Sequence, residues 1–425
     1  MYNMERKVLV ISNNCFSQSD SNGRTLGGMF AGWQKQNLAQ FCVIAKDPNW
    51  ELCDNYYCLE DKTVLNAFLK FTKAVGRRLV RDSTQTATEI ETVRPNVGKR
   101  TVVKLLLRRL AWSFKRWNSK EFNKWVDAYD PDMVLLQLGD SSFMFDIALY
   151  VAKSRSVPLI TFCTEGYYFF EKNCFEHSKL DFIFYPLYKR LYNKTVESTM
   201  LHMKYAIYSN SKLQNDYSNR FNVPSSVIYT GSSLNFNESK FDKEIIRVSY
   251  LGNLGVDRDS ALIDVGEVLH GINTNYIIDV YGNADFDMQK RFANAPGINY
   301  KGLVSYEEVK RVIEDSDILF HVESDHGYRE RQLQYAFSTK IADSISSGKC
   351  FVLYAPKELA CSEYISDTKA GWLATNKDEL RDVIVSILEN PKERQEVLSR
   401  ARSVASQNHD YLANAQKFQD IILSI

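Results

Sequence analysis

Short apolar segments alternate with longer amphipathic segments along most of the chain. A buried parallel strand reads as an uninterrupted apolar run, whereas a helix repeats its apolar residues at three- and four-residue steps. Helical segments separate the apolar runs, and this order predicts α/β architecture with parallel sheets. The predicted strands are residues 7–12, 41–45, 132–138, 158–163, 205–209, 226–229, 245–251, 277–281, 297–301, 318–322, 350–354 and 370–374.

A polar stretch without an apolar period, residues 231–243, interrupts this order and is interpreted as a linker. At 425 residues the chain is also longer than one hydrophobic core usually serves, so two domains are expected. We predict two Rossmann-like, doubly wound domains at residues 1–235 and 236–405. A second polar stretch, residues 82–98, is predicted to be a mobile loop.

The composition argues against several classes of protein. The formal net charge of +1 gives the chain no nucleic-acid signature. No apolar run approaches the ~20 residues that span a bilayer, and the first residues lack a signal-peptide layout. The eight cysteines form no CxxC pair and the six histidines are scattered. We therefore expect reduced core cysteines in a cytoplasmic protein and no metal held by the protein.

The most informative stretch, residues 317–354, contains a strand, a polar loop, a helix and a second strand. Ligands of parallel sheets bind beyond the carboxyl ends of the strands, where Glu323 and the helix start are expected. Ser338 is a good N-cap that leaves first-turn N–H groups pointing outward, and Lys340 adds a positive charge, so this end favours a phosphate. Asp343 shares a helix face with Lys340 and could bridge vicinal hydroxyls. The alternative is a surface Lys–Asp pair and a solvated glutamate.

This stretch resembles the donor-binding segment of retaining GT-B glycosyltransferases of family 4. Their pattern is a strand, a glutamate, a loop, a Lys-x-x-Glu helix that ends in small-Gly-Lys-Pro, and another strand. Residues 340–343 (KIAD) and 347–350 (SGKC) hold those places. The resemblance implies that Glu323 contacts the donor sugar and Asp343 the ribose. The chain departs from the pattern in Asp343 for Glu, in Cys350 for Pro, and in an insert at residues 326–337 that separates the two acids.

A glycine-containing turn after the strand at 245–251 carries a second part of the resemblance. The family has Gly-Arg-Leu here, followed by a lysine, and both basic groups contact the donor diphosphate. Arg258 takes the place of the lysine, whereas Asn253 replaces the arginine. The guanidinium group of an arginine can donate a pair of hydrogen bonds to a phosphate, and glycines allow the backbone to come close to a ligand. The predicted donor site comprises Gly252, Asn253, Gly255, Arg258, Gly282, Glu323, Ser338, Thr339, Lys340 and Asp343.

The first half offers candidates for the acceptor side. Glycines after the first strand could bring backbone N–H groups close to a phosphate or sugar, or could form an ordinary loop before a helix at 29–38. GT-B enzymes have a similar loop, which implies roles for Arg24, Gly27 and Gly28. Glu165 follows the strand at 158–163, where many family members have a histidine. It could assist acceptor deprotonation, or it could be a loop residue beside the aromatic run 167–170.

Residues Lys99–Lys120 contain eight Lys and Arg and no acid, with apolar residues at helical steps. This pattern predicts a basic amphipathic helix with interfacial tryptophans at Trp112 and Trp117, which could lie on an anionic membrane. Five further basic residues are expected in the preceding helix. The alternative is a helix that packs on the sheet and leaves a solvated basic face.

Together these patterns resemble a two-domain, metal-independent GT-B glycosyltransferase that uses a UDP- or GDP-type sugar donor and no other cofactor. The resemblance implies transfer with retention to a glycan or lipid-linked glycan, in cell-surface polysaccharide or glycoconjugate synthesis at the cytoplasmic membrane face. It also implies that residues 406–425 cross back to the first domain. Arg258, Lys340, Glu323 and Glu165 are the predicted catalytic residues. The alternatives are a nucleotide-sugar epimerase on the same fold and a non-catalytic partner that binds a sugar nucleotide or glycan.

Overall fold

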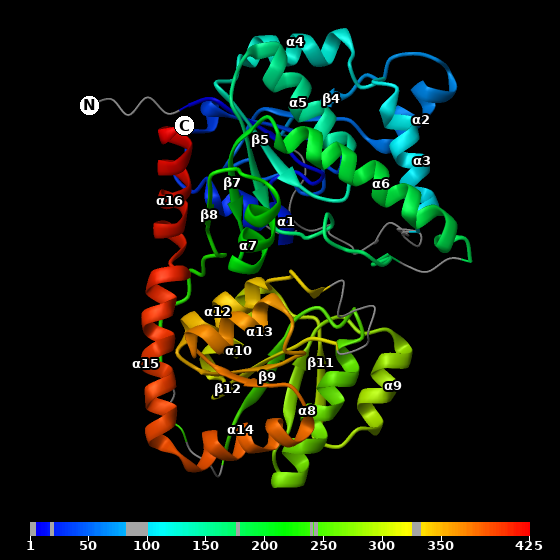
Figure 1. Ribbon diagram of the computed structural model, residues 1–425. Coiled ribbons are helices and arrows are strands. Elements are labelled where there is room, and N and C mark those ends of the chain that lie inside the picture. The colour runs from blue at the N-terminus through cyan, green and yellow to red at the C-terminus, as the bar shows by residue number, and fades with distance from the viewer. Residues whose placement is uncertain are drawn as a thin grey trace. The chain divides into compact units, whose positions relative to one another are not determined.

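The computed structural model describes residues 6–17, 21–81, 101–175, 179–238, 241, 245–324 and 333–425. The chain forms two compact units (Figure 1). The first unit comprises Met1–Ile228 with Ala415–Ile425, and the second comprises Tyr229–Asn414. The predicted loop at 82–98 and most of the predicted insert at 326–337 lie outside the described residues. The domain limits at 235 and 405 stay predictions.

An eight-stranded sheet in the order β4-β3-β2-β1-β5-β6-β7-β8 forms the centre of the first unit. Its strand pairs are parallel except β3 with β4. The strand order reverses beside β1, so the carboxyl ends of β1 and β5 form the usual ligand edge. The strands are β1 (Val8–Ile11), β2 (Leu38–Cys42), β3 (Tyr56–Cys58), β4 (Arg77–Arg78), β5 (Met133–Leu138), β6 (Leu159–Cys163), β7 (Met203–Tyr208) and β8 (Ser225–Val227).

Helices cover both faces of this sheet. Phe30, just after α1, packs on one face with α16, whereas Phe122 of α4 packs against Phe41 from the other face. The helices are α1 (Ser21–Met29), the 3-10 helix η1 (Lys35–Asn37), α2 (Asp61–Leu69), α3 (Val102–Ser113), α4 (Lys120–Tyr129), α5 (Phe143–Arg155), α6 (Asp181–Met200), α7 (Ser211–Arg220) and the end of α16 (Tyr411–Ser424). Phe418 of α16 lies 5.0 Å from Phe30, measured between ring centroids, and is fully buried. The predicted return of the last helix to the first domain is therefore confirmed.

A six-stranded, all-parallel sheet in the order β11-β10-β9-β12-β13-β14 forms the centre of the second unit. The order reverses between β9 and β12, so the carboxyl ends of these two strands form its ligand edge. The strands are β9 (Val248–Leu251), β10 (Ile278–Tyr281), β11 (Ile298–Gly302), β12 (Ile318–Val322), β13 (Cys350–Tyr354) and β14 (Trp372–Ala374).

Two apolar clusters lie on opposite faces of this second sheet. Cys350 and Val352 of β13 belong to the cluster that includes α8 and α14, whereas Phe351 and Leu353 belong to the cluster that includes α12 and α13. This alternation is what a doubly wound sheet requires, because successive strand residues point to opposite faces. The helices are α8 (Arg258–Ile272), α9 (Phe286–Asn294), α10 (Tyr306–Asp315), α12 (Thr339–Ser347), α13 (Ala360–Thr368), α14 (Lys377–Glu389) and α15 (Pro391–Asn408).

Two local predictions are wrong in the first half. The glycines after β1 lie inside helix α1 rather than in a loop before a helix at 29–38. A β-carbon at Gly23 would come within 2.8 Å of the Ser17 nitrogen, so this glycine lets the helix pack closely on the preceding segment. The expected helix containing Arg77 and Arg78 ends at Leu69, and the two arginines form the edge strand β4.

The tryptophans of the basic segment are not at the surface, which is a third correction. Trp112 stacks on Phe143 with ring centroids 3.9 Å apart, and Trp117 packs edge-on against Tyr150 at 5.3 Å. Both tryptophans are 1% exposed. Because α5 offers aromatic partners on its outer face, these indoles are part of the core. The described part of the segment forms one helix, α3, which ends at Ser113, and its last residue, Lys120, begins α4.

Candidate functional site

Arg258 and Glu323 meet at the ligand edge of the second sheet. Arg258 is the first residue of α8, after the turn that follows β9, and Glu323 directly follows β12. Nε of Arg258 donates to Oε2 of Glu323 at 2.8 Å, and Nη2 donates to Oε1 at 3.0 Å. The side chains are only 11% and 3% exposed. A buried bidentate pair of this kind fixes the orientation of both side chains and keeps both of them charged.

His321 is the second neighbour of Glu323 and was not predicted. Its Nε2 lies 2.9 Å from Oε1 of Glu323. Burial, opposed by the neighbouring carboxylate and reinforced by the charges of Arg258 and Lys340, lowers the pKa of His321. The imidazole is therefore neutral, and it must carry its proton on Nε2 to donate to Glu323. Nδ1 is buried and has no hydrogen-bond partner among the described residues.

Glu323 is an anion in spite of its position. Burial opposes its ionisation, but the charge of Arg258 and the hydrogen bond from His321 outweigh that effect, so the pKa of Glu323 lies below its ordinary value. The carboxylate is thus kept charged by two neighbours on adjacent parts of the same sheet edge.

Lys340 reaches the same edge from the other face. Ser338 caps α12 as predicted, and its hydroxyl accepts a hydrogen bond from the Lys340 backbone nitrogen at 3.3 Å. A β-carbon built on Gly252 would lie 3.2 Å from Cε of Lys340 and 2.9 Å from the Tyr250 hydroxyl. The lysine side chain therefore lies over Gly252, at the end of β9. The structure brings Arg258, Glu323, Lys340 and the N-terminus of α12 together.

The turn between β9 and α8 is held by its own polar groups. Oδ1 of Asn253 accepts from the Gly255 nitrogen at 3.0 Å, and its carbonyl accepts from the Tyr250 hydroxyl at 2.9 Å. Asn253, where the family has an arginine, therefore shapes the turn. Val256 has a φ of 66° and Asp257 a φ of 57°. Such left-handed conformations are costly for β-branched residues and are concentrated at functional sites.

Asp343 and Gly282 complete the described donor-side set. The hydroxyl of Ser232 donates to Oδ1 of Asp343 at 2.7 Å, so this carboxylate is engaged by the segment that begins the second unit. A β-carbon at Gly282 would meet the carbonyl of Gly252 and the side chain of Leu254. Gly282 therefore lets the turns after β9 and β10 pack closely. Thr339, the first residue of α12, is buried.

The acceptor-side candidates lie in the first unit. Arg24, Gly27 and Gly28 are in α1, which follows β1, and Glu165 follows β6. The Glu165 carbonyl accepts a hydrogen bond from the Cys163 thiol at 3.3 Å. In the neighbouring aromatic run, Tyr168 and Phe170 are buried, which favours inward packing for these two rings over a ligand-facing wall. The roles of these residues stay predictions.

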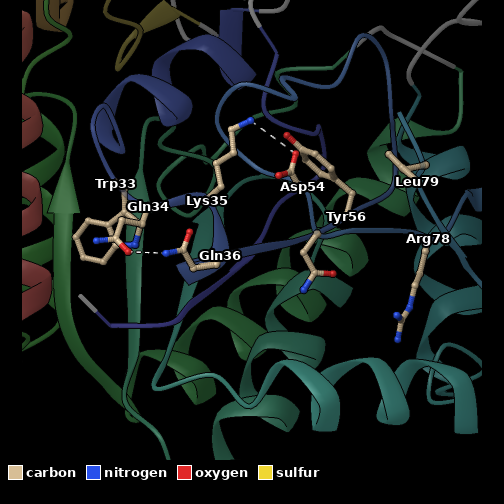
Figure 2. A pocket seen from close by; sticks show the side chains of 9 residues that line it. Trp33, Gln34, Lys35, Gln36, Asp54, Tyr56, Arg78 and Leu79 are labelled. Carbon is tan, nitrogen blue, oxygen red and sulfur yellow. Dashed lines mark hydrogen bonds and ion pairs between the residues drawn. The ribbon is translucent and has the colours of Figure 1, made fainter. Parts of the chain in front are cut away.

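A pocket of about 710 Å³ lies at the opposite edge of the first sheet (Figure 2). Its lining residues precede β2 and β3 or end β4, so it opens at the amino ends of the parallel strands. Inside it, Nζ of Lys35 lies 3.8 Å from Oδ1 of Asp54, and Gln36 donates to Gln34 at 2.6 Å. It is therefore separate from the carboxyl edge that the sheet order marks as the ligand side.

The described residues contain no group of three or more His, Cys, Asp or Glu side chains that could hold a metal ion. Within the same residues no helix has the length and apolar character needed to cross a bilayer. The chemistry that the second unit offers comes from two cations, one carboxylate and a capped helix N-terminus. This combination can hold an anionic group and a hydroxyl-rich group side by side.

Comparison with known proteins finds similarity to glycosyltransferases. Residues 267–420 match the family model described as "Glycosyl transferase-like", which spans Glu323, Lys340 and Asp343. No curated protein sequence matches the chain. Among solved structures, Anabaena Alr3699/HepE in complex with UDP is similar over 99% of this chain and 100% of that chain, with a TM-score of 0.63 and 12% identity.

The same Anabaena protein in complex with UDP-glucose has a TM-score of 0.60 at 12% identity, over 99% of this chain and 100% of that chain. WaaG, described as a glycosyltransferase involved in lipopolysaccharide biosynthesis, has a TM-score of 0.58 at 10% identity, over 98% of this chain and 99% of that chain. At such identities the likeness shows the fold. The predicted resemblance is therefore confirmed at the level of the fold: the chain has the GT-B fold, and its residues 267–420 are similar to the glycosyl transferase-like family.

Proposed function

We propose that the protein transfers a hexose from a nucleoside diphosphate sugar to a hydroxyl group of a glycan or lipid-linked glycan. The observation that carries this proposal is the convergence of Lys340, Arg258 and the N-terminus of α12 at the carboxyl ends of β9 and β12. A diphosphate is the donor group that such a site fits, because it carries charge and many acceptor oxygens.

In the proposed reaction the bond between the anomeric carbon and the diphosphate oxygen breaks, and its electron pair leaves with the diphosphate. Lys340 and the first-turn N–H groups of α12 stabilise the charge that develops there. These groups supply charge of the kind that a metal ion supplies in other transferases. The acceptor oxygen bonds to the anomeric carbon and loses its proton, which Glu165 or the departing phosphate takes up. We infer retention of configuration from the family resemblance alone.

Glu323 has two roles in this scheme. Its carboxylate holds the fork of Arg258, and its remaining acceptor capacity is directed at the hydroxyls of the donor sugar. Within the described part of the chain, Nη1 of Arg258 makes long contacts, 3.3 Å to the Asn253 carbonyl and 3.4 Å to that of Gly255. These are the contacts that a diphosphate oxygen would replace. The Asp343 carboxylate would accept hydrogen bonds from the ribose hydroxyls, which would replace its present hydrogen bond from Ser232.

The choice of donor follows the solved relatives. The Anabaena protein binds UDP and UDP-glucose, so a UDP-hexose is the first donor to test, with GDP-sugars as the second. WaaG is involved in lipopolysaccharide biosynthesis, which supports an acceptor that is a precursor of a cell-surface glycan. None of the eight cysteines forms a disulfide and all are buried, which fits work in the reducing cytoplasm.

A thermal-shift panel of nucleotides and nucleotide sugars tests the donor, since only ligands of the folded state raise the melting temperature by mass action. The matched pair is Lys340→Ala and Lys290→Ala, because Lys290 is an exposed lysine of α9 in the same unit. UDP-glucose should stabilise the wild type and Lys290→Ala but not Lys340→Ala. The same stabilisation in all three proteins would refute the diphosphate role.

Incubation with the stabilising donor then separates the three functions. A transferase releases nucleoside diphosphate faster when acceptor glycans are added. An epimerase converts the donor sugar without any acceptor. A non-catalytic partner binds the donor and leaves it intact under both conditions.

A further inference from the structure

Three neighbouring helices of the first unit expose large apolar side chains. Helix α3 packs against both α2 and α6 (Figure 1). Arg108 of α3 is paired with Asp61 at the start of α2, and Arg109 of α3 donates to Thr195 of α6 at 3.0 Å. The three helices therefore form one surface. Its exposed apolar residues, called here the α2–α3–α6 patch, are Leu65, Leu69, Leu107, Leu110, Phe114, Phe182, Ile183 and Leu187.

The patch is additional to the core that the same helices supply. Each of its residues is between 48% and 76% exposed. The inward faces are occupied by other residues, such as Val64 of α2, Trp112 of α3 and Tyr188 of α6, which are at most 5% exposed. Eight large apolar side chains exposed on three neighbouring helices exceed the singly scattered apolar residues that are normal on a monomer, and such clustering marks an interaction site.

The surroundings of the patch are strongly basic. Residues 62–81 and 101–120 contain six Lys or Arg each and no Asp or Glu, although the whole chain has a net charge of only +1. Arg108 and Arg109 are engaged between the helices. The exposed lysines are Lys62, Lys70, Lys73, Lys104, Lys115 and Lys120, and α6 adds Arg190 and Lys194.

We propose that the α2–α3–α6 patch docks the protein on an anionic lipid bilayer. Apolar side chains enter the interface between headgroups and acyl chains, while lysines around them contact lipid phosphates. A second copy of the chain is a poorer occupant, because an isologous interface would place two lysine-rich rims against each other. This inference goes beyond the proposed glycosyl transfer and does not depend on it.

The inference narrows the membrane face that the sequence predicts. Trp112 and Trp117 drop out of that face, because they are buried. Leu107, Leu110 and Phe114, which belong to the same predicted repeat at steps of three and four residues, are exposed on α3 or directly after it. Helix α3 thus presents one apolar stripe to the core and another to the solvent. The exposed apolar residues of its neighbours α2 and α6 extend the solvent-facing stripe on both sides.

Co-sedimentation of the full chain with vesicles tests the proposal. One set of vesicles contains phosphatidylglycerol and phosphatidylcholine, and the other contains phosphatidylcholine alone. We expect binding to the anionic vesicles only, and weaker binding as salt is raised. The first variant carries Leu107→Ser, Leu110→Ser and Phe114→Ser. Its control carries Phe286→Ser and Leu303→Ser, two residues of the second unit that are 79% and 71% exposed.

The second variant carries Lys104→Gln and Lys115→Gln, with Lys290→Gln and Lys392→Gln as its control, since all four lysines are exposed. The lysine variant should lose roughly tenfold or more in partition coefficient at low salt, and its control should lose little. Lys340→Ala should bind vesicles like the wild type, which keeps this test separate from that of the diphosphate site.

Three outcomes would overturn the proposal. One is no binding to anionic vesicles at any salt concentration. Another is binding that neither patch variant weakens relative to its control. The third is a wild type that self-associates in size-exclusion chromatography without vesicle binding, with dissociation in the serine variant, which would assign the patch to a second copy of the chain.

Discussion

Arg258 and Glu323 form a two-point ion pair in which Nη2 also lies 2.7 Å from Oε2, and both side chains are almost withdrawn from water. The pair joins the first turn of α8 to the end of β12, which are 65 residues apart in the chain. Since neither charge has bulk water around it, each depends on the other for its stability.

Glu323→Gln should therefore destabilise the second unit. The substitution keeps the shape of the side chain but leaves the guanidinium of Arg258 buried beside a neutral amide, a change that costs about 3 kcal/mol or more. Chemical denaturation with fluorescence detection would measure the loss. Glu307→Gln is the control, since Glu307 forms an exposed pair with Lys310 and should cost at most about 1 kcal/mol. Equal effects of the two substitutions would contradict the buried-pair argument.

Lys340→Ala should lower the rate of sugar transfer by about a hundredfold to a thousandfold while leaving the melting temperature of the free protein nearly unchanged. The lysine acts on charge that develops in the transition state, and removal of one such group typically costs ~3 to 4 kcal/mol. Steady-state release of nucleoside diphosphate measures the effect. A variant that folds like the wild type and has unchanged turnover would remove Lys340 from the mechanism.

Gly252→Ala should weaken donor binding with a smaller effect on stability. The added methyl group would lie 3.2 Å from Cε of Lys340 and 2.9 Å from the Tyr250 hydroxyl, so the lysine side chain must move. We expect the KM for the donor to rise roughly tenfold, the effect of about 1.4 kcal/mol of lost binding. Gly271→Ala, near the end of α8, is the matched control, because the nearest contact of its β-carbon would be Nη1 of Arg381 at 3.8 Å. Similar kinetics in both variants would contradict the proposed path of the lysine side chain.

Acidification should destabilise the second unit through His409. Burial lowers the pKa of this histidine from 6.5 to about 4. Its Nδ1 donates to the Thr230 carbonyl and its Nε2 accepts from the Tyr364 hydroxyl, each at 2.9 Å, so the folded state holds the neutral ring. Between pH 6.5 and about 4 the unfolded chain binds the extra proton. The contribution of neutral His409 to the free energy of unfolding is therefore complete above pH 6.5. It is lost as the pH falls from 6.5 to about 4, and the loss amounts to about 3 kcal/mol.

The comparison of His409→Gln with His202→Gln checks this assignment. His202 is exposed, so its replacement should leave the slope of stability against pH unchanged. His409→Gln should lower stability at neutral pH and flatten the slope between pH 6.5 and 4. A slope identical to that of the wild type would show that other groups dominate acid unfolding.

The secondary structure of the proposed donor side could be predicted from the sequence because its determinants are local. Ser338, Lys340 and the glycine at 348 define one short helix between two apolar strands, and the structure has this helix and its cap. The glycine-rich turn before Arg258 is equally local. That these two segments meet follows from the strand order β9-β12, which residue patterns alone do not encode.

Features that depend on tertiary packing were missed. His321 lies in the middle of an apolar strand, two residues before Glu323, so both side chains point to the same side. That spacing was the available signal for a histidine that contacts the carboxylate. Trp112 was assigned to a membrane interface because helical periodicity does not say which of two apolar stripes faces the core. The partner that decides it, Phe143, is 31 residues further along the chain.

The return of α16 has a consequence for how the protein is made. The first unit's core is incomplete until Phe418 and Ile422 pack into it, yet these side chains follow the whole second unit in the chain. On the ribosome the second unit can fold while the first still exposes apolar surface beside Phe30 and Phe162. A nascent chain that has not yet released α16 would therefore be a form that chaperones and proteases recognise.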